Sequence, residues 1–405
     1  MNVLVVGSGG REHALVWKLA QSPRLEALDA APGNPGIASL ATCHPVAPAD
    51  GEALLALCRE REIDLVVVGP EAPLVAGVAD VLRHGGVPVF GPSAAAARIE
   101  GSKAFAKEVM EAAGVATARR LDEPRAPCVV KADGLAAGKG VFVCPTQREA
   151  EAAWQRARAP GGGVLVEELL EGEEVSLFAV SDGAEALVLP PVRDAKRLRD
   201  GDEGPNTGGM GAYSPVPFLG DFQAERLADE VHRPVLGELA RRGTPFVGLL
   251  YAGLMLTEDG PRVLEFNCRF GDPETQALAP RLDGDLLDVL ARAAGGNLGG
   301  AELAVSDDAA VTVVLASTGY PDAPVTGTRL SGVEAAERRG ALVFHAGTAI
   351  REGALVSAGG RVLAVTATGT TVDEARERAY AAVAAIEFPD ACFRRDIGVT
   401  VIRVG

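Results

Sequence analysis

The first hundred residues alternate short apolar runs with segments of helical periodicity. Strand-like runs occupy residues 2–6, 25–31, 63–69 and 87–91, and helical patterns occupy 13–21, 51–62 and 75–85. Continuous Val and Leu runs between helices are typical of a parallel sheet that is covered on both faces. The turns after such strands lie where open α/β sheets bind ligands. The pattern therefore predicts an N-terminal parallel α/β lobe over residues 1–100 that binds substrate.

The pattern changes after residue 94. A helix-forming stretch with a glycine in its middle (94–114) leads to a small α+β unit, which we expect to be a lid subdomain over about 122–188. A Gly-, Asn- and Asp-rich segment (193–216) shows no periodicity, and a stretch of this length inside a compact protein is usually a functional loop. A helix over 223–243 and two strands complete a central α+β region that we place at 101–308.

The last hundred residues have their own pattern. Strand-like runs at 311–317, 342–348 and 361–369 precede a helical pattern near 373–386. These elements predict a C-terminal α+β domain over 309–405. The fold class expected from the sequence is thus a multidomain α/β protein.

Composition excludes several classes of function. The chain has 405 residues, a formal net charge of −16 and only 4% aromatic residues. An acidic surface repels phosphate backbones and anionic lipid, so we expect no nucleic-acid and no membrane partner. Its six cysteines are scattered, which is typical of reduced thiols in a cytoplasmic protein. The five histidines form no metal-ligand pattern. We expect a monomer that begins with a strand and not with a signal peptide.

The turn GSGGREH at 7–13 has two readings. A dinucleotide fingerprint needs a third glycine where Glu12 stands, which counts against a nicotinamide cofactor. Glycines before a helix leave backbone N–H groups free for an anion, and Arg11 adds positive charge, so a phosphate monoester would suit this turn. A tight turn without a ligand is the alternative.

The segment KADGLAAGKG at 131–140 resembles a P-loop but lacks its spacing and its hydroxyl residue. It lies between two strand-like runs, so it reads as a glycine-rich hairpin that could fold over a triphosphate. A mobile surface loop is the alternative. Five of the six lysines lie in this segment or in two other loop or Gly-rich segments, and compact ammonium charges suit phosphate oxygens.

The segment RVLEFNCRFGDPETQ at 262–276 carries the strongest signal. In a strand, Glu265, Asn267 and Arg269 lie on one face. A carboxylate and an amide oxygen suit Mg²⁺, and a guanidinium could bind a phosphoryl group in transfer. The alternative is a solvated polar face.

The acidic segment 166–176 has two interpretations. It is either a solvated edge or an edge that binds adenine and ribose.

These motifs together resemble a known family. VVGSGGREHAL, APGNPG, VVGPEAPLVAG, EGSKAF, KADGLAAGKGV, GPNTGGMGAYSP, EFNCRFGDPETQ and FHAGT follow one another in the order seen in the glycinamide ribonucleotide synthetases, which are ATP-grasp ligases. The resemblance implies a central ATP-grasp core. It also implies the ATP-dependent ligation of glycine to 5-phosphoribosylamine through glycyl phosphate, in de novo purine biosynthesis. An ATP-grasp ligase for another carboxylate is the alternative.

The resemblance also implies roles for individual residues. Metal ligands would be Glu265 and Asn267, with Mg²⁺ or Mn²⁺ bound, and catalytic residues would be Arg269, Lys139 and Asp272. ATP would be bound by Lys103, Lys131, Gly134, Gly138, Lys139, Gly140, Glu167, Glu168, Leu170 and Glu174. Glycine and 5-phosphoribosylamine would be bound by Gly9, Gly10, Arg11, Glu71, Asn206, Thr207, Gly208 and Gly209.

Three features depart from the family pattern. Ala195 stands where the family often has a histidine, in the stretch Asp194-Ala195-Lys196-Arg197. The connectors before Cys128 and before Val164 are also shorter than the family usually shows. Unlike many ATP-grasp relatives, the strand at 247–257 offers no additional metal carboxylate, so ATP oxygens and water would complete the shell of the metal.

Overall fold

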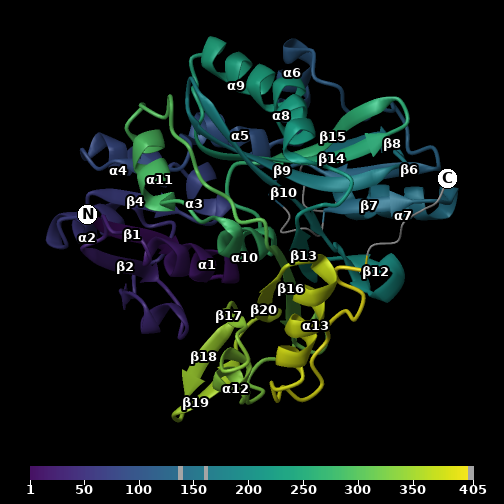
Figure 1. Ribbon diagram of the computed structural model, residues 1–405. Coiled ribbons are helices and arrows are strands. Elements are labelled where there is room, and N and C mark those ends of the chain that lie inside the picture. Colours follow the sequence, from purple (N-terminus) through teal and green to yellow (C-terminus); the bar gives the residue numbers. More distant parts are fainter. Residues whose placement is uncertain (136–139, 159–162, 400–405) are drawn as a thin grey trace.

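The N-terminal residues form a five-stranded parallel sheet. The computed structural model describes residues 1–135, 140–158 and 163–399, and this sheet lies at one side of the molecule (Figure 1). Its strand order is β3 (Thr42–Cys43), β2 (Ala27–Pro32), β1 (Asn2–Gly7), β4 (Leu65–Val68) and β5 (Val89–Phe90). Val3 and Val5 point into one hydrophobic core, whereas Leu4 and Val6 point into another. The predicted parallel sheet with two buried faces is confirmed.

Helices cover this sheet on both sides. They are α1 (Gly10–Leu19), α2 (Gly51–Glu60), α3 (Glu71–Val75) and α4 (Val78–His84). The helix predicted over 75–85 is α4, which begins at Val78, whereas α3 lies in the turn before it and was not predicted. Gly77, with a φ of 88°, separates them, and this left-handed conformation is one that glycine adopts readily.

An eight-stranded antiparallel sheet spans the centre and the C-terminal part of the molecule. Its order is β15 (Gly260–Asn267), β14 (Val247–Thr257), β9 (Glu173–Asp182), β10 (Ala186–Asp194), β13 (Gly211–Ser214), β16 (Ala309–Ala316), β20 (Arg361–Gly369) and β17 (Leu342–His345). Because β13 pairs with β16, one sheet joins the central region to the C-terminal domain.

The 193–216 segment is more ordered than its composition indicated. It contains β13 and a small hairpin of β11 (Arg197–Arg199) and β12 (Glu203–Asn206). These strands are three or four residues long, too short for a readable period of two. Their pairing is fixed by neighbouring strands, so the expectation of a structureless loop is wrong for them.

A small three-stranded sheet forms the lid. Its strands are β7 (Val141–Cys144), β6 (Cys128–Ala132) and β8 (Val164–Glu168), with α7 (Gln147–Arg158) packed against it. β6 and β7 are antiparallel, which confirms a hairpin in place of a P-loop. The lid expected over 122–188 includes β9 and part of β10, but these strands belong to the large sheet.

Further helices pack around the central sheet (Figure 1). They are α5 (Ala94–Gly101), α6 (Lys103–Ala113), α8 (Asp221–Glu230), α9 (His232–Arg241), α10 (Glu274–Leu278) and α11 (Leu286–Ala294). The helix predicted over 223–243 is broken between α8 and α9. Pro234 explains the break, because its ring would clash with the carbonyl of Glu230 in a continuous helix.

The C-terminal domain adds α12 (Val333–Glu337), α13 (Val372–Val383) and a projecting hairpin of β18 (Thr348–Arg351) and β19 (Ala354–Ser357). α13 packs on β20 and β16. Within the described part of the chain, every helix is too short or too polar to cross a membrane.

Candidate functional site

The polar face of β15 and the turn after it form the centre of the site. Nη2 of Arg269 donates to Oδ1 of Asn267 across 3.4 Å. Glu265, two residues earlier on the same strand, has a carboxylate oxygen 3.7 Å from Nζ of Lys196. The pairing of β14 with β15 shifts register at Leu264, and Val263 and Phe266 on either side of this irregularity enter a hydrophobic core. The structure thus brings Glu265, Asn267 and Arg269 together.

Two carboxylates orient the guanidinium of Arg269. Nε lies 3.1 Å from Oε2 of Glu71, and Nη2 lies 3.1 Å from Oε1 of Glu100. Burial alone would raise the pKa of the Glu71 carboxyl, but Arg269 and Arg11 lower it to about 2. Glu71 therefore stays ionised. Glu100 was not anticipated from the sequence; it lies at the end of α5 and also accepts from the backbone N–H of Cys268 at 2.8 Å.

The positive charge around Glu265 is unusually dense. Desolvation raises the pKa of this carboxyl, but Lys196, Lys131, Lys103 and Arg269 together lower it below its ordinary value. Glu265 is therefore an anion, as a metal ligand requires.

A buried ion cluster underlies the lid. The carboxylate of Glu167 on β8 lies 2.6 Å from Nζ of Lys131 on β6 and 2.5 Å from Nζ of Lys107 on α6. Lys131 also donates to the carbonyl of Leu264 at 2.8 Å, which ties the lid to β15. Lys107 was not assigned from the sequence. Its contacts place it in the same cluster.

The first half of the glycine-rich hairpin lies against the start of α6. Lys103 donates its backbone N–H to Oδ1 of Asp133 at 2.6 Å and its Nζ to the carbonyl of Gly134 at 3.0 Å. The carbonyl of Gly140 accepts from Ala132 at 2.8 Å. Gly138 and Lys139 lie outside the described residues.

The acidic segment divides between the site and the surface. Glu174 forms an ion pair with Lys196, which also lies near Glu265. Glu168 pairs with Arg119 at 3.3 Å, and the Arg119 side chain is exposed. Leu170 is half-buried in the connection after β8. Glu174, Lys196 and Glu265 therefore share one site, whereas the carboxylate of Glu168 faces away from it.

Several polar residues close to this site were not predicted from the sequence. Oγ of Ser176 lies 2.9 Å from the hydroxyl of Tyr251 and donates to Oε1 of Glu274 at 3.2 Å. Desolvation raises the pKa of Asp194 well above its ordinary value; Lys196 opposes this shift, and neighbouring carboxylates such as Glu274 add to it. Glu274 stands in the quoted DPETQ motif, but Ser176 and Tyr251 look like ordinary strand residues in the sequence.

The segment 206–209 is held from both sides. Oγ1 of Thr207 donates to the carbonyl of Lys196 at 2.9 Å and accepts from the N–H of Gly209 at 3.0 Å. Asn206 reaches the lid, where its Nδ2 donates to the carbonyl of Val141 at 3.4 Å. Gly208 contacts the C-terminal domain through Arg361. These residues therefore connect the segment that carries Lys196, the lid and the C-terminal domain.

The N-terminal turn is closed by Glu12. Oε2 of Glu12 accepts from the N–H of Gly9 at 2.5 Å, and Oε1 accepts from Nε of Arg11 at 2.6 Å. The N–H of Gly9 is thus used inside the turn, contrary to the expectation that it is free for an anion. Nη1 of Arg11 donates to the carbonyl of Phe270 at 3.1 Å, which docks this lobe on the turn after β15.

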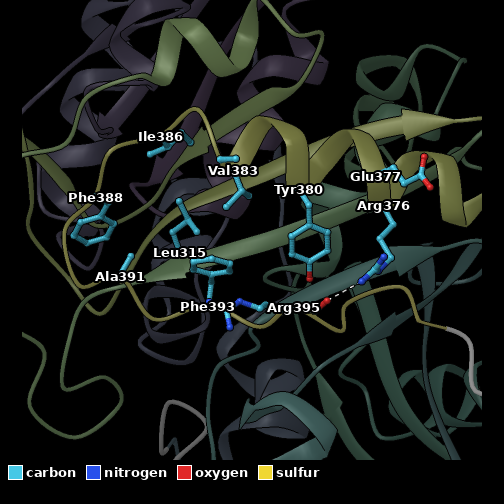
Figure 2. Close-up of a pocket in the computed structure, with 11 residues that line it drawn as sticks. Leu315, Arg376, Glu377, Tyr380, Val383, Ile386, Phe388, Ala391, Phe393 and Arg395 are labelled. Atoms are coloured by element: carbon cyan, nitrogen blue, oxygen red, sulfur yellow. Dashed lines mark hydrogen bonds between the residues drawn. The ribbon is translucent and has the colours of Figure 1, made fainter.

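A cavity of about 570 Å³ lies in the C-terminal domain, apart from these residues (Figure 2). Leu315, Tyr380, Phe388 and Phe393 contribute to its wall. Nη2 of Arg376 donates to the carbonyl of Arg395 at 2.8 Å beside it. The lining contains none of the residues predicted to bind substrate, nucleotide or metal.

Comparisons with known proteins agree with this arrangement. Family models for the N domain, the ATP-grasp (A) domain and the C domain of phosphoribosylglycinamide synthetase match residues 1–100, 101–275 and 310–400. A phosphoribosylamine–glycine ligase of Streptomyces coelicolor is 54% identical, and one of Mesorhizobium japonicum is 52% identical; each match covers 98% of both chains. The crystal structure of the Thermotoga maritima phosphoribosylamine–glycine ligase is similar with a TM-score of 0.84 and 36% identity, over 98% of this chain and 100% of that chain.

Proposed function

The chain belongs to the phosphoribosylglycinamide synthetase family, and on this premise we propose that it ligates glycine to 5-phosphoribosylamine with consumption of ATP. The products are glycinamide ribonucleotide, ADP and phosphate, as in de novo purine biosynthesis. The observation that carries the proposal is the match to all three family models in order along one chain. We also propose the division into domains 1–100, 101–308 and 309–405, with the lid inside the second.

The reaction needs an activated carboxylate, because the carboxylate of glycine is a poor acyl donor. An oxygen of this carboxylate attacks the γ-phosphorus of ATP, the bond to the β-phosphate oxygen breaks, and ADP leaves with glycyl phosphate remaining. The amine of 5-phosphoribosylamine then attacks the acyl carbon, phosphate leaves, and the nitrogen loses a proton. Positioning and neutralisation of charge dominate such phosphoryl transfer.

A divalent cation is part of this proposal. The oxygens of Glu265 and Asn267 are the donor types that Mg²⁺ prefers, and the dense positive charge around Glu265 keeps it ionised. The described residues offer no cluster of three or more His, Cys, Asp and Glu side chains suited to a metal, so the protein would supply few ligands and ATP oxygens the others. When bound, Mg²⁺ neutralises charge on the phosphates; Mn²⁺ suits the same oxygens.

The basic residues have distinct proposed roles. Arg269, oriented by Glu71 and Glu100, faces the phosphoryl group in transfer. Lys131 and Lys103, which approach from the lid and from α6, bind the ATP phosphates. Lys139, Gly138 and Gly140 are proposed to close over them.

The remaining proposed roles concern the base, the ribose and the substrates. Glu167, Glu168 and Leu170 form the adenine edge, and Glu174 binds the ribose. Gly9, Gly10, Arg11 and Glu71 hold 5-phosphoribosylamine. Glycine and the acyl phosphate are enclosed by Asp272 and by Asn206, Thr207, Gly208 and Gly209. The contact between Arg11 and the carbonyl of Phe270 supports this division, because it sets the N-terminal turn beside the turn that carries Asp272.

The test is the release of ADP and phosphate by the purified protein with MgATP. Glycine and 5-phosphoribosylamine, the latter formed from ammonia and ribose 5-phosphate, are supplied separately and together. Formation of one amide per ATP only with both substrates supports the proposal. Turnover with another carboxylate and not with glycine would favour the alternative ligase. Replacing Mg²⁺ with Mn²⁺ in the same assay compares the two cations.

The assembly state and the compartment are also proposals. The six free cysteines, four of them buried, fit a reducing cytoplasm, and a site assembled from one chain needs no second copy. Size-exclusion chromatography with light scattering tests the proposed monomer.

A further inference from the structure

Arg361 stands at the first position of β20, in the C-terminal domain, and reaches into the site. Nη1 donates to the backbone carbonyl of Asp272 at 2.6 Å and to those of Gly208 and Gly209. Nη2 lies 3.0 Å from Oδ2 of the Asp272 carboxylate. One guanidinium therefore connects the 206–209 segment to the turn after β15, although Arg361 is 153 residues from Gly208 along the chain.

Tyr320 holds the same segment from the same domain. Its hydroxyl accepts from the N–H of Gly208 at 3.0 Å. The tyrosine ring packs against Gly360, where an added Cβ would stand 2.5 Å from Cδ2 of the ring. Tyr320 and Arg361 thus both hydrogen-bond to Gly208 from the C-terminal domain.

Asp272 connects this unit to the N-terminal lobe. Its Oδ1 accepts from Nε2 of Gln276 at 2.8 Å, and Oδ2 lies 3.7 Å from the position that a Cβ on Gly9 would occupy. Desolvation raises the pKa of Asp272, but the Arg361 guanidinium lowers it below its ordinary value. Asp272 is therefore a fixed anion where the three parts of the chain meet.

We propose that Arg361 is a positioning residue that, with Tyr320, holds Asp272 and the 206–209 segment closed over the acyl phosphate until the amine arrives. The inference rests on the proposed function. Water hydrolyses an exposed acyl phosphate, giving free glycine and phosphate. Closure of Asp272 and the 206–209 segment therefore determines the ratio of amide formed to ADP formed.

The experiment measures amide and ADP in the same reaction for Arg361→Ala, Arg361→Lys and Tyr320→Phe. Lysine keeps the charge but cannot donate to three carbonyls and a carboxylate in one plane. We expect about a tenfold increase in the KM for glycine and amide formation well below one per ADP in both Arg361 variants. Lysine should be closer to the wild type. Tyr320→Phe should show the same change to a smaller extent, and the KM for ATP should stay within about twofold.

Arg338→Ala is the control, because this exposed arginine lies in the same domain and pairs only with the exposed Glu334 at 3.7 Å. Urea unfolding identifies any variant that fails to fold, in which case the remaining two carry the test. Amide and ADP in a 1:1 ratio in every folded variant would refute the inference. Loss of glycine-dependent ADP release together with amide would also refute it, because Arg361 would then act in the activation step. Failure of the wild type to ligate glycine would instead refute the proposed function.

Discussion

The ammonium group of Lys196 lies 3.7 Å from the carboxylate of Glu265 and forms a second ion pair with Glu174. The cation of Lys196 thus stands between the proposed metal ligand and the proposed ribose ligand. Those carboxylates raise the pKa of the Lys196 ammonium well above its ordinary value, although desolvation opposes them. Lys196 therefore remains charged and supplies fixed positive charge beside the proposed metal ligand Glu265.

Replacement of Glu265 tests the metal site. Glu265→Gln keeps the shape of the side chain but removes the charge that holds a divalent cation, so we expect turnover to fall by at least about a hundredfold. Glu258→Gln, an exposed substitution in the turn between β14 and β15, is the matched control. Steady-state kinetics over a range of Mg²⁺ concentrations provides the measurement. Wild-type turnover in Glu265→Gln at every Mg²⁺ concentration would exclude Glu265 as a ligand.

The ion cluster under the lid predicts a change in stability. Glu167→Gln leaves Lys131 and Lys107 without their shared carboxylate in a buried site, which costs about 3–5 kcal/mol for a broken buried pair. Glu168→Gln on the same strand breaks only a partly exposed pair with Arg119, for which about 0–1 kcal/mol is typical. Urea unfolding of both variants measures the difference, and equal stabilities would contradict this role of Glu167.

Local patterns explain which parts of the site could be read from the sequence. Glu265 and Asn267 share a face because β15 alternates its side chains, and Arg269 follows two residues later in the turn after the strand. Glu12 stands where the dinucleotide fingerprint needs its third glycine, and the fingerprint alone predicts no contact for its side chain. Its spacing of three residues from Gly9 is also the spacing of a capping box, which would have predicted its bond to the Gly9 N–H.

Contacts between distant segments could not be read in this way. Glu100 reaches Arg269 from a helix, and Arg361 reaches Asp272 from another domain. Both contacts depend on how the sheets and helices pack against one another, which cannot be recognised from local patterns in a single sequence. The short strands β11, β12 and β13 were missed for the same reason, because their neighbours determine their pairing.

Alanine substitutions at two glycines of the 193–216 segment distinguish the effect of backbone strain from that of a steric contact in the site. Gly209 and Gly201 both have positive φ, 105° and 69°, so alanine costs roughly 1–2 kcal/mol at either position. A Cβ on Gly209 would stand 2.3 Å from Cδ of Pro273, whereas one on Gly201 meets nothing within 4 Å. Gly209→Ala should therefore lose turnover by about tenfold or more, while Gly201→Ala keeps it. Similar kcat and KM values in both variants would contradict a role for this contact.

Acid should weaken the ion pair of Glu71 and Arg269. Glu71 has a folded pKa of about 2, below the ordinary value of 4.5, so the folded state binds fewer protons than the unfolded chain between these values. The pair therefore contributes stability in full above about pH 4.5 and loses it as the pH falls toward 2, with a total on the order of 3 kcal/mol. Glu71→Gln should have a lower free energy of unfolding than the wild type at pH 7. This difference should become smaller as the pH falls from about 4.5 to 3. The exposed Glu60→Gln should show no such decrease. Urea unfolding across this range measures both differences, and a difference for Glu71→Gln that stays constant with pH would show that Arg269 does not hold this carboxylate ionised.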